Sequence, residues 1–157
     1  DKGLVEMVRQ VLRECKIAAD MIELEITETC VMEDPEEALR TLQAFHEMGL
    51  RIAIDDFGTG YSSLSYLKRF PLDVLKIDQS FVADVTDDED DAAIVDMIIA
   101  MGHRLKLSVI AEGVETESQA DFLHEHGCDN AQGYFFDRPM PAKDLLTRFV
   151  KEQVVEK

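Results

Sequence analysis

The chain has 157 residues, of which 16 are Lys or Arg and 33 are Asp or Glu, so its formal net charge is −17. With 46% hydrophobic and 31% charged residues it can bury an apolar core, which excludes a disordered chain, and its length suits one domain or part of a larger one. The acidic excess also excludes binding to a nucleic acid polymer through a basic face, because such binding neutralises phosphates with Lys and Arg. An anionic ligand would need metal ions as a bridge.

Insertion of this segment into a membrane is not expected, because no apolar run approaches the roughly 20 residues that span a bilayer. The N-terminus has no signal-peptide pattern, and three widely spaced cysteines are typical of reduced thiols. We therefore expect a cytoplasmic protein whose cysteines fill the core. The missing initiator Met suggests a piece of a longer chain.

Hydrophobic patterning predicts helices that alternate with strands along the chain. Residues 3–16 are expected to form an amphipathic helix, and residues 21–27 alternate as a strand before a turn at 29–32. Asp34 and Pro35 are the N-cap and first residue of the next helix, which ends at Gly49. The pattern continues with a strand at 50–54, a short helix at 62–68, a strand at 72–77, an acidic loop around Asp87 before a helix carrying Ile94 to Met101, a strand at 107–111, a helix at 116–126, a strand end at 130–134 and a last helix at 142–151.

This alternation indicates a parallel sheet with crossover helices, which is either doubly wound or a barrel. Five strand–helix units are predicted, and no linker or low-complexity stretch divides residues 1–157. We expect a single domain of the α/β class.

Polar side chains recur where the apolar strands stop. In parallel α/β folds the C-terminal ends of the strands share one face, where catalytic groups lie. Several carboxylates on one face repel each other unless cations compensate them, which predicts a Mg²⁺ or Mn²⁺ site. Two such ions with a nearby lysine to orient or deprotonate a water would suit phosphodiester hydrolysis. The residues concerned are Glu25, Glu28, Asp55, Asp56, Lys76, Glu112, Glu115 and Gln132.

Each of these residues also has a plain structural interpretation. Adjacent acids such as Asp55 and Asp56 often cap helices or lie in solvated loops. Glu112 and Glu115 could favour the positive end of the following helix. Lys76, however, lies within an apolar strand, where an inward-facing lysine needs a charged partner.

Five segments, in order and spacing, closely resemble the EAL domain family. These are ELEITE (23–28), DDFGTGYSSL (55–64), LKID (75–78), AEGVE (111–115) and QGY (132–134). The resemblance implies a modified TIM barrel that uses two Mg²⁺ or Mn²⁺ ions to hydrolyse cyclic-di-GMP to linear pGpG in bacterial second-messenger signalling. It also implies a homodimer.

Residue by residue, the resemblance implies that Glu25, Asp55, Asp56 and Glu112 belong to the metal and metal-water shell. Lys76 would position or activate the attacking water, which makes Lys76 and Glu112 the expected catalytic pair.

The resemblance implies supporting roles for four further residues. Glu28 would anchor the loop from Phe57 to Ser63, and Glu115 would support the site. Gln132 and Pro139 would contact the substrate.

The chain departs from the family pattern in extent. The family's Glu-Ala-Leu motif, whose Glu is a metal ligand, and the Asn ligand of the next strand both lie upstream of the region represented here, and the Glu37-Ala38-Leu39 triplet falls instead in the helix that begins at Asp34 and Pro35. A full barrel takes roughly 250 residues and eight strands, so residues 1–157 are interpreted as the C-terminal part of one EAL-type barrel, incomplete at about five strands and impaired alone.

Two alternatives remain open at this stage. One is a degenerate, non-catalytic EAL module that senses the dinucleotide or mediates dimerisation. The other is a phosphoacceptor receiver domain, which is disfavoured because its Lys should lie several units after the acidic pair, whereas Lys76 follows in the next strand.

Overall fold

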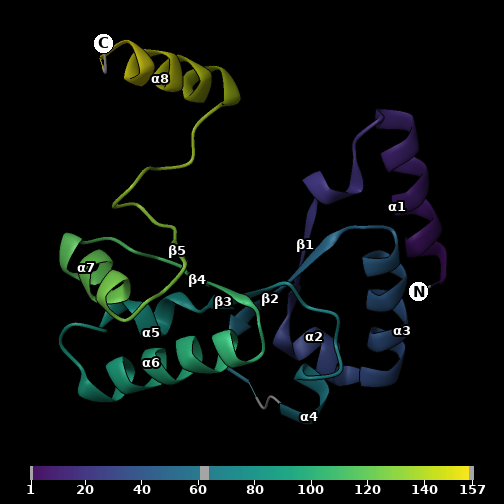
Figure 1. Cartoon of the computed structure of the whole chain (residues 1–157), viewed down its shortest axis with the longest axis horizontal. Coiled ribbons are helices and arrows are strands. Elements are labelled where there is room, and N and C mark those ends of the chain that lie inside the picture. Colours follow the sequence, from purple (N-terminus) through teal and green to yellow (C-terminus); the bar gives the residue numbers. More distant parts are fainter. Residues whose placement is uncertain (1, 61–63, 156–157) are drawn as a thin grey trace.

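The computed structural model describes residues 2–60 and 64–155. Five parallel strands form one sheet, namely β1 (Glu23–Thr27), β2 (Arg51–Phe57), β3 (Val74–Ile77), β4 (Ser108–Ala111) and β5 (Asn130–Ala131). The helices are α1 (Lys2–Cys15), the 3-10 turn η1 (Ala19–Met21), α2 (Glu28–Glu33), α3 (Pro35–Glu47), α4 (Leu64–Leu67), α5 (Gln79–Ala83), α6 (Glu89–Arg104), α7 (Glu117–Glu125) and α8 (Ala142–Val155) (Figure 1).

The strand order identifies the architecture. Neighbours in the sheet are also neighbours in the chain, in the order β1-β2-β3-β4-β5. A doubly wound sheet would reverse its order at a switch point. Because parallel crossovers are almost always right-handed, an order that never reverses places the crossover helices on one side of the sheet. The fold is therefore an arc of a (β/α) barrel, and the predicted parallel α/β class is confirmed.

The core lies around strands β2 and β3. Every residue of β3 is buried, and Ile52, Ala53 and Ile54 of β2 are fully inaccessible to solvent. Helix α3 packs on β2, and helix α6 packs on β3 and β4. Strands buried on both faces read as continuous apolar runs, which explains why Lys76 stands out in β3.

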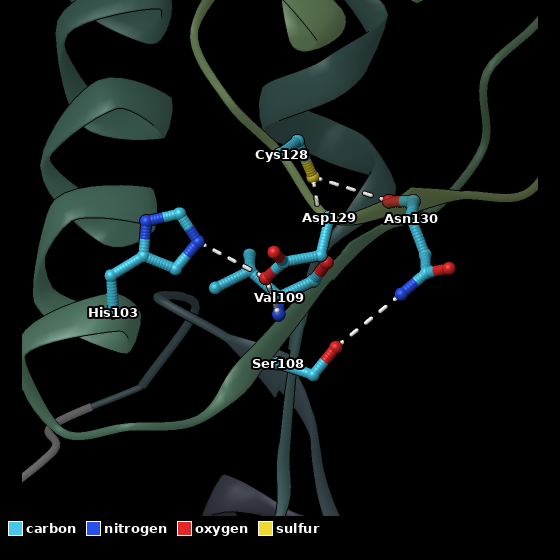
Figure 2. Close-up of polar contacts among 6 residues, drawn as sticks. All are labelled: His103, Ser108, Val109, Cys128, Asp129 and Asn130. Atoms are coloured by element: carbon cyan, nitrogen blue, oxygen red, sulfur yellow. Dashed lines mark hydrogen bonds and ion pairs between the residues drawn. The ribbon is translucent and has the colours of Figure 1, made fainter.

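Two aspartates, each just before a strand, make equivalent hydrogen bonds to the backbone of the neighbouring strand. Asp73 stands just before β3, and its Oδ2 accepts a hydrogen bond from Ile52 N–H at 2.9 Å. Asp129 stands just before β5, and its Oδ2 accepts from Val109 N–H at 2.8 Å (Figure 2). His103 Nε2 lies 3.0 Å from the same Asp129 oxygen. Each carboxylate satisfies a backbone donor of the neighbouring strand, which favours this register over its alternatives.

Several predicted elements differ from the structure, including the strand predicted at 50–54, which runs to Phe57 as β2. Residues 29–32, predicted as a turn, lie in helix α2, which Thr27 caps by accepting a hydrogen bond from Cys30 N–H at 3.4 Å. Helix α5 was not predicted, although Asp78 caps it by accepting from Ser80 N–H at 2.9 Å. Strand β5 ends at Ala131 instead of extending to residue 134. In α2 and α5, a side-chain cap that satisfies a backbone N–H favours a helix that the apolar pattern does not mark.

The last predicted helix is confirmed as α8. Figure 1 shows it at the end of an extended segment, apart from the other helices. Arg148 of α8 forms an ion pair with Asp137 of that segment. The predicted short helix at 62–68 is confirmed from Leu64 to Leu67, and its first residues lie outside the described part of the chain.

The cysteines are free thiols, but the expectation that they fill the core was wrong for two of them. Cys15 ends α1 and Cys30 lies in the first turn of α2, and both are exposed. Only Cys128 is partly buried. Within residues 2–60 and 64–155, no helix has both the length and the apolar composition to cross a membrane.

Candidate active site

The buried Lys76 collects three carboxylates from neighbouring strand ends. Its Nζ lies 2.6 Å from Glu112 Oε1, 2.8 Å from Glu25 Oε1 and 3.2 Å from Asp55 Oδ1. The lysine side chain is 5% exposed, whereas that of Glu25 is 52% exposed. An ammonium in an apolar strand thus has the charged partners that its burial requires. The structure brings these four predicted site residues together.

A bulge in β2 explains how two adjacent aspartates reach one rim. In a regular strand, Asp55 and Asp56 would point to opposite faces. The register with β3 shifts between Ile54 and Phe57, so the two aspartates lie opposite Lys76 alone. Asp56 has a φ of 53°, a left-handed conformation that Asp tolerates better than most residues. Asp56 N–H also donates to Asp55 Oδ1 at 3.0 Å, which ties the pair together.

The Asp56 carboxyl lies near two other acidic side chains, those of Asp55 and Asp78. Burial, then the negative charges of Asp55 and Asp78, raises the pKa of the Asp56 carboxyl above its usual range. Asp78 ends the predicted LKID segment but had been assigned no role. The signal that could have identified it is its position directly after a buried strand, which is the same signal that identified Asp55.

The side chain of Gln132 joins the cluster through Glu112. Its Nε2 donates a hydrogen bond of 2.5 Å to Glu112 Oε1, the oxygen that Lys76 also contacts. Glu112 therefore accepts from both the Lys76 ammonium and the Gln132 amide. Gln132 follows β5 and Glu112 follows β4, so adjacent strand ends again supply the contact.

A pocket of about 600 Å³ opens beside this pair. Four predicted residues line it: Glu112, Glu115, Gln132 and Pro139. Its walls also include Tyr134 and Arg138, which the sequence had not assigned to a site, and the Arg138 guanidinium lies 4.2 Å from the centre of the Tyr134 ring. No spacing pattern marks Arg138. The volume is in the usual range for small-molecule sites.

Glu28 lies apart from the lysine cluster and holds the loop after β2. It is 1% exposed, and its Oε2 accepts a hydrogen bond from Gly58 N–H at 3.2 Å. Its Oε1 has no hydrogen-bond partner among the described residues, and a Cβ on Gly60 would lie 2.8 Å from that oxygen. Residues 61–63 of the predicted loop lie outside the described part of the chain. The part of the loop that the structure describes, up to Gly60, thus packs directly on Glu28.

The pKa of Lys76 lies above its ordinary value. Burial favours the neutral amine, but hydrogen bonds to Glu112, Glu25 and Asp55 outweigh it. Lys76 is therefore a proton-bearing donor at neutral pH.

The ligand chemistry of the cluster fits a divalent cation. Mg²⁺ and Mn²⁺ prefer carboxylate oxygens, and the three carboxylates on Lys76 already share one positive centre. Among the residues that the structure describes, no three His, Cys, Asp or Glu side chains are grouped closely enough to hold a metal ion by themselves. The ammonium of Lys76 occupies the point on which the oxygens converge.

Comparison with known proteins identifies relatives of the chain. The bifunctional diguanylate cyclase/cyclic di-GMP phosphodiesterase MucR of Pseudomonas aeruginosa is 49% identical over 144 residues, which are 92% of this chain and 21% of that protein. The PaMucR phosphodiesterase in its c-di-GMP complex is 49% identical with a TM-score of 0.89, covering 91% of this chain and 58% of that one. The manganese/cy-diGMP complex of Klebsiella pneumoniae BlrP1 is 34% identical with a TM-score of 0.82, covering 88% and 36%.

The chain thus spans about a fifth of the curated relative and somewhat more than half of the solved phosphodiesterase. A family model described as the EAL domain matches residues 1–139, which include the whole sheet and the lysine cluster. The chain belongs to the EAL domain family.

Proposed function

We propose that this chain is the C-terminal part of a single EAL-type barrel, residues 1–157, and that the completed barrel hydrolyses cyclic-di-GMP to linear pGpG. The observation that carries the proposal is the convergence of Glu25, Asp55 and Glu112 on the buried Lys76. Relatives named as cyclic di-GMP phosphodiesterases and solved with the dinucleotide support this substrate. Action in the cytoplasm, as a homodimer, is part of the same proposal.

Glu25, Asp55, Asp56 and Glu112 would hold Mg²⁺ or Mn²⁺, which when bound lowers the pKa of a water and polarises the phosphoryl oxygens. Manganese in the related BlrP1 complex supports this assignment, and the oxygen-only donor set is what these ions prefer.

The residues of the chain itself orient the reactants. Lys76 donates hydrogen bonds from Nζ at the point where the carboxylates converge, and its role is to position or activate the attacking water. Gln132 holds Glu112 in place through its amide. The pocket lined by Glu115 and Pro139 accepts the dinucleotide beside these groups, and Glu28 anchors the loop after β2.

A second candidate, binding without turnover, is favoured by one observation. The ammonium of Lys76 stands where the carboxylates converge, and the described residues alone do not assemble a three-acid metal group. We infer that the chain alone binds the dinucleotide through its pocket and turns it over poorly.

The experiment compares this chain with a chimera in which the preceding part of the PaMucR phosphodiesterase is fused ahead of residue 1. Both are incubated with cyclic-di-GMP and MgCl₂ or MnCl₂, and pGpG is separated by chromatography. The chimera is expected to release pGpG, and its Glu112→Gln variant is expected to release none. Strong turnover by the chain alone would contradict its impairment, and an inactive chimera that still binds cyclic-di-GMP would favour the sensing role.

A further inference from the structure

Gln119 is a buried polar residue outside the lysine cluster. Three polar or charged side chains are buried among the described residues: Lys76 in the cluster, Glu28 under the loop, and Gln119, which is 6% exposed. Burying an amide is unfavourable unless it is hydrogen-bonded, so a buried glutamine calls for an account of its partners.

The side chain of Gln119 connects two segments that are distant in sequence. Its Oε1 accepts from Glu115 N–H at 2.8 Å and from Thr116 N–H at 3.0 Å. Its Nε2 donates to the carbonyl oxygen of Ala83 at 2.9 Å. Ala83 is the last residue of α5, where carbonyls lack partners within the helix. Gln119 thus ties the loop after β4 to the end of α5.

Capping of α7 alone does not require this arrangement. A capping box needs the N3 side chain to reach the N-cap N–H, and Gln119 does so with Thr116. The same oxygen also takes the N–H of Glu115, and the amide nitrogen reaches a residue 36 positions earlier. Helix caps are commonly at the surface, whereas the Gln119 side chain is buried between the loop after β4 and the end of α5.

Both segments that Gln119 joins line the pocket of the candidate active site. Gln79 at the start of α5 and Glu115 in the loop are on its wall, with Gly113 between them. Gly113 is pressed against α5, since a Cβ on it would lie 2.6 Å from Gln79 Cβ. The wall is therefore held at two points, by the Gly113 contact at the beginning of α5 and by Gln119 at its end.

We propose that Gln119 is a positioning residue that fixes the Gln79–Glu115 wall of the pocket and so sets the affinity for the dinucleotide. The identity of the ligand in this proposal rests on the proposed function, whereas the hydrogen bonds that Gln119 makes do not depend on it. Within the described part of the chain Gln119 bonds to Glu115, Thr116 and Ala83 and not to the lysine cluster, so its loss changes ligand binding more than the arrangement around Lys76.

Two substitutions separate this role from general stability. Gln119→Leu keeps the approximate volume and removes all three bonds. Gln119→Glu keeps an oxygen for Glu115 N–H and Thr116 N–H but cannot donate to Ala83. Leu123→Val, one turn later in α7 at a side chain that is 1% exposed, serves as a matched core change that leaves the tie intact.

The first readout is amide hydrogen exchange at Glu115 and Thr116, which requires no ligand. Gln119→Leu is expected to speed exchange at both amides on the order of ten-fold, since each amide loses its acceptor. Gln119→Glu is expected to restore slow exchange at these two positions, and Leu123→Val to leave them slow. Equal acceleration in Gln119→Leu and Leu123→Val would overturn the tie.

The second readout is binding of cyclic-di-GMP in the presence of Ca²⁺, measured by calorimetry well below the melting temperature. Gln119→Leu is expected to weaken binding about five-fold or more, and Gln119→Glu, which cannot donate to Ala83, to recover only part of it. Unchanged affinity in Gln119→Leu would overturn the positioning role. If the unsubstituted chain does not bind the dinucleotide, the inference that the chain alone binds it is wrong, while exchange at Glu115 and Thr116 still decides whether Gln119 holds the wall.

Discussion

Lys76 and Glu112 make the shortest ion pair of the lysine cluster, with Nζ 2.6 Å from Oε1 and the lysine side chain 5% exposed. The lysine lies in β3, the middle strand of the sheet, and Glu112 directly follows β4, the strand beside it. This pair places a permanent positive charge among acids that would otherwise repel one another.

Lys76→Met removes that charge and is expected to lower the free energy of unfolding by about 3 kcal/mol, because the partly buried carboxylates lose their counter-ion. Millimolar Mg²⁺ or Mn²⁺ should stabilise the variant more than the unsubstituted chain, since a divalent cation can replace the lost charge. Urea unfolding with and without the metal measures both effects. Lys68→Met, at an exposed position, is the control, and an unchanged midpoint in Lys76→Met would contradict the assignment.

Asp56→Asn tests the bulge in β2. Asn tolerates the left-handed backbone at this position, so the bulge is expected to persist. Burial and neighbouring acids raise the pKa of Asp56, so its ionised form disfavours folding, and the stability it contributes below its unfolded-state pKa is lost as the pH rises through the raised folded-state value.

At pH 7 and without metal, Asp56→Asn is therefore expected to be more stable than the unsubstituted chain. At a pH below the unfolded-state pKa of Asp56 this difference should vanish. Thermal melts across pH measure the first effect, and titration with Mn²⁺ should show weaker binding by the variant. A variant that is less stable at every pH would show that the carboxylate, not the backbone, maintains the bulge.

Gly60→Ala tests the packing of the loop on Glu28. The new methyl would lie 2.8 Å from Glu28 Oε1, so the buried carboxylate or the loop must move. We expect faster amide exchange at Gly58, whose N–H bonds to Glu28 Oε2. Glu28→Gln, which keeps an acceptor oxygen of the same reach, should leave the Gly58 amide protected, and loss of protection there would contradict the anchoring role.

Asp129→Leu tests the hydrogen bond that sets the register of β4 and β5. Val109 is fully buried, and its N–H would lose its acceptor, which costs roughly 1–3 kcal/mol of unfolding free energy. Asp129→Asn retains an oxygen for Val109 N–H and should cost clearly less (Figure 2). Chemical denaturation of both variants measures the difference, and equal losses would mean that the charge facing His103 matters rather than the backbone bond.

Cys128 is expected to react with iodoacetamide much more slowly than Cys15 and Cys30. Burial raises the pKa of the Cys128 thiol, so less of the reactive thiolate is present at pH 8, whereas the other two thiols are exposed. Its labelling should rise only at more alkaline pH or on unfolding. Peptide mass spectrometry after timed labelling checks this, and equal rates at the three sites at pH 8 would contradict it.

The order of elements and the position of the acidic residues were predictable from sequence. Apolar runs of four to six residues interrupted by helical periods mark the strands, and a charged residue inside or just after such a run is conspicuous. Lys76, Glu112 and Asp55 were found in this way, and the chain covers all five motifs that resemble the EAL family.

Tertiary structure decided what those residues do to one another. The bulge that turns Asp55 and Asp56 to one rim depends on pairing with β3, and the buried bonds of Gln119 depend on α5 packing beside α7's first turn. Neither the bulge nor the bonds of Gln119 can be predicted from sequence periodicity, because both arise from contacts between residues far apart in the chain. By itself the sequence determined which side chains cost free energy to bury, and the fold determined which partners compensate that cost.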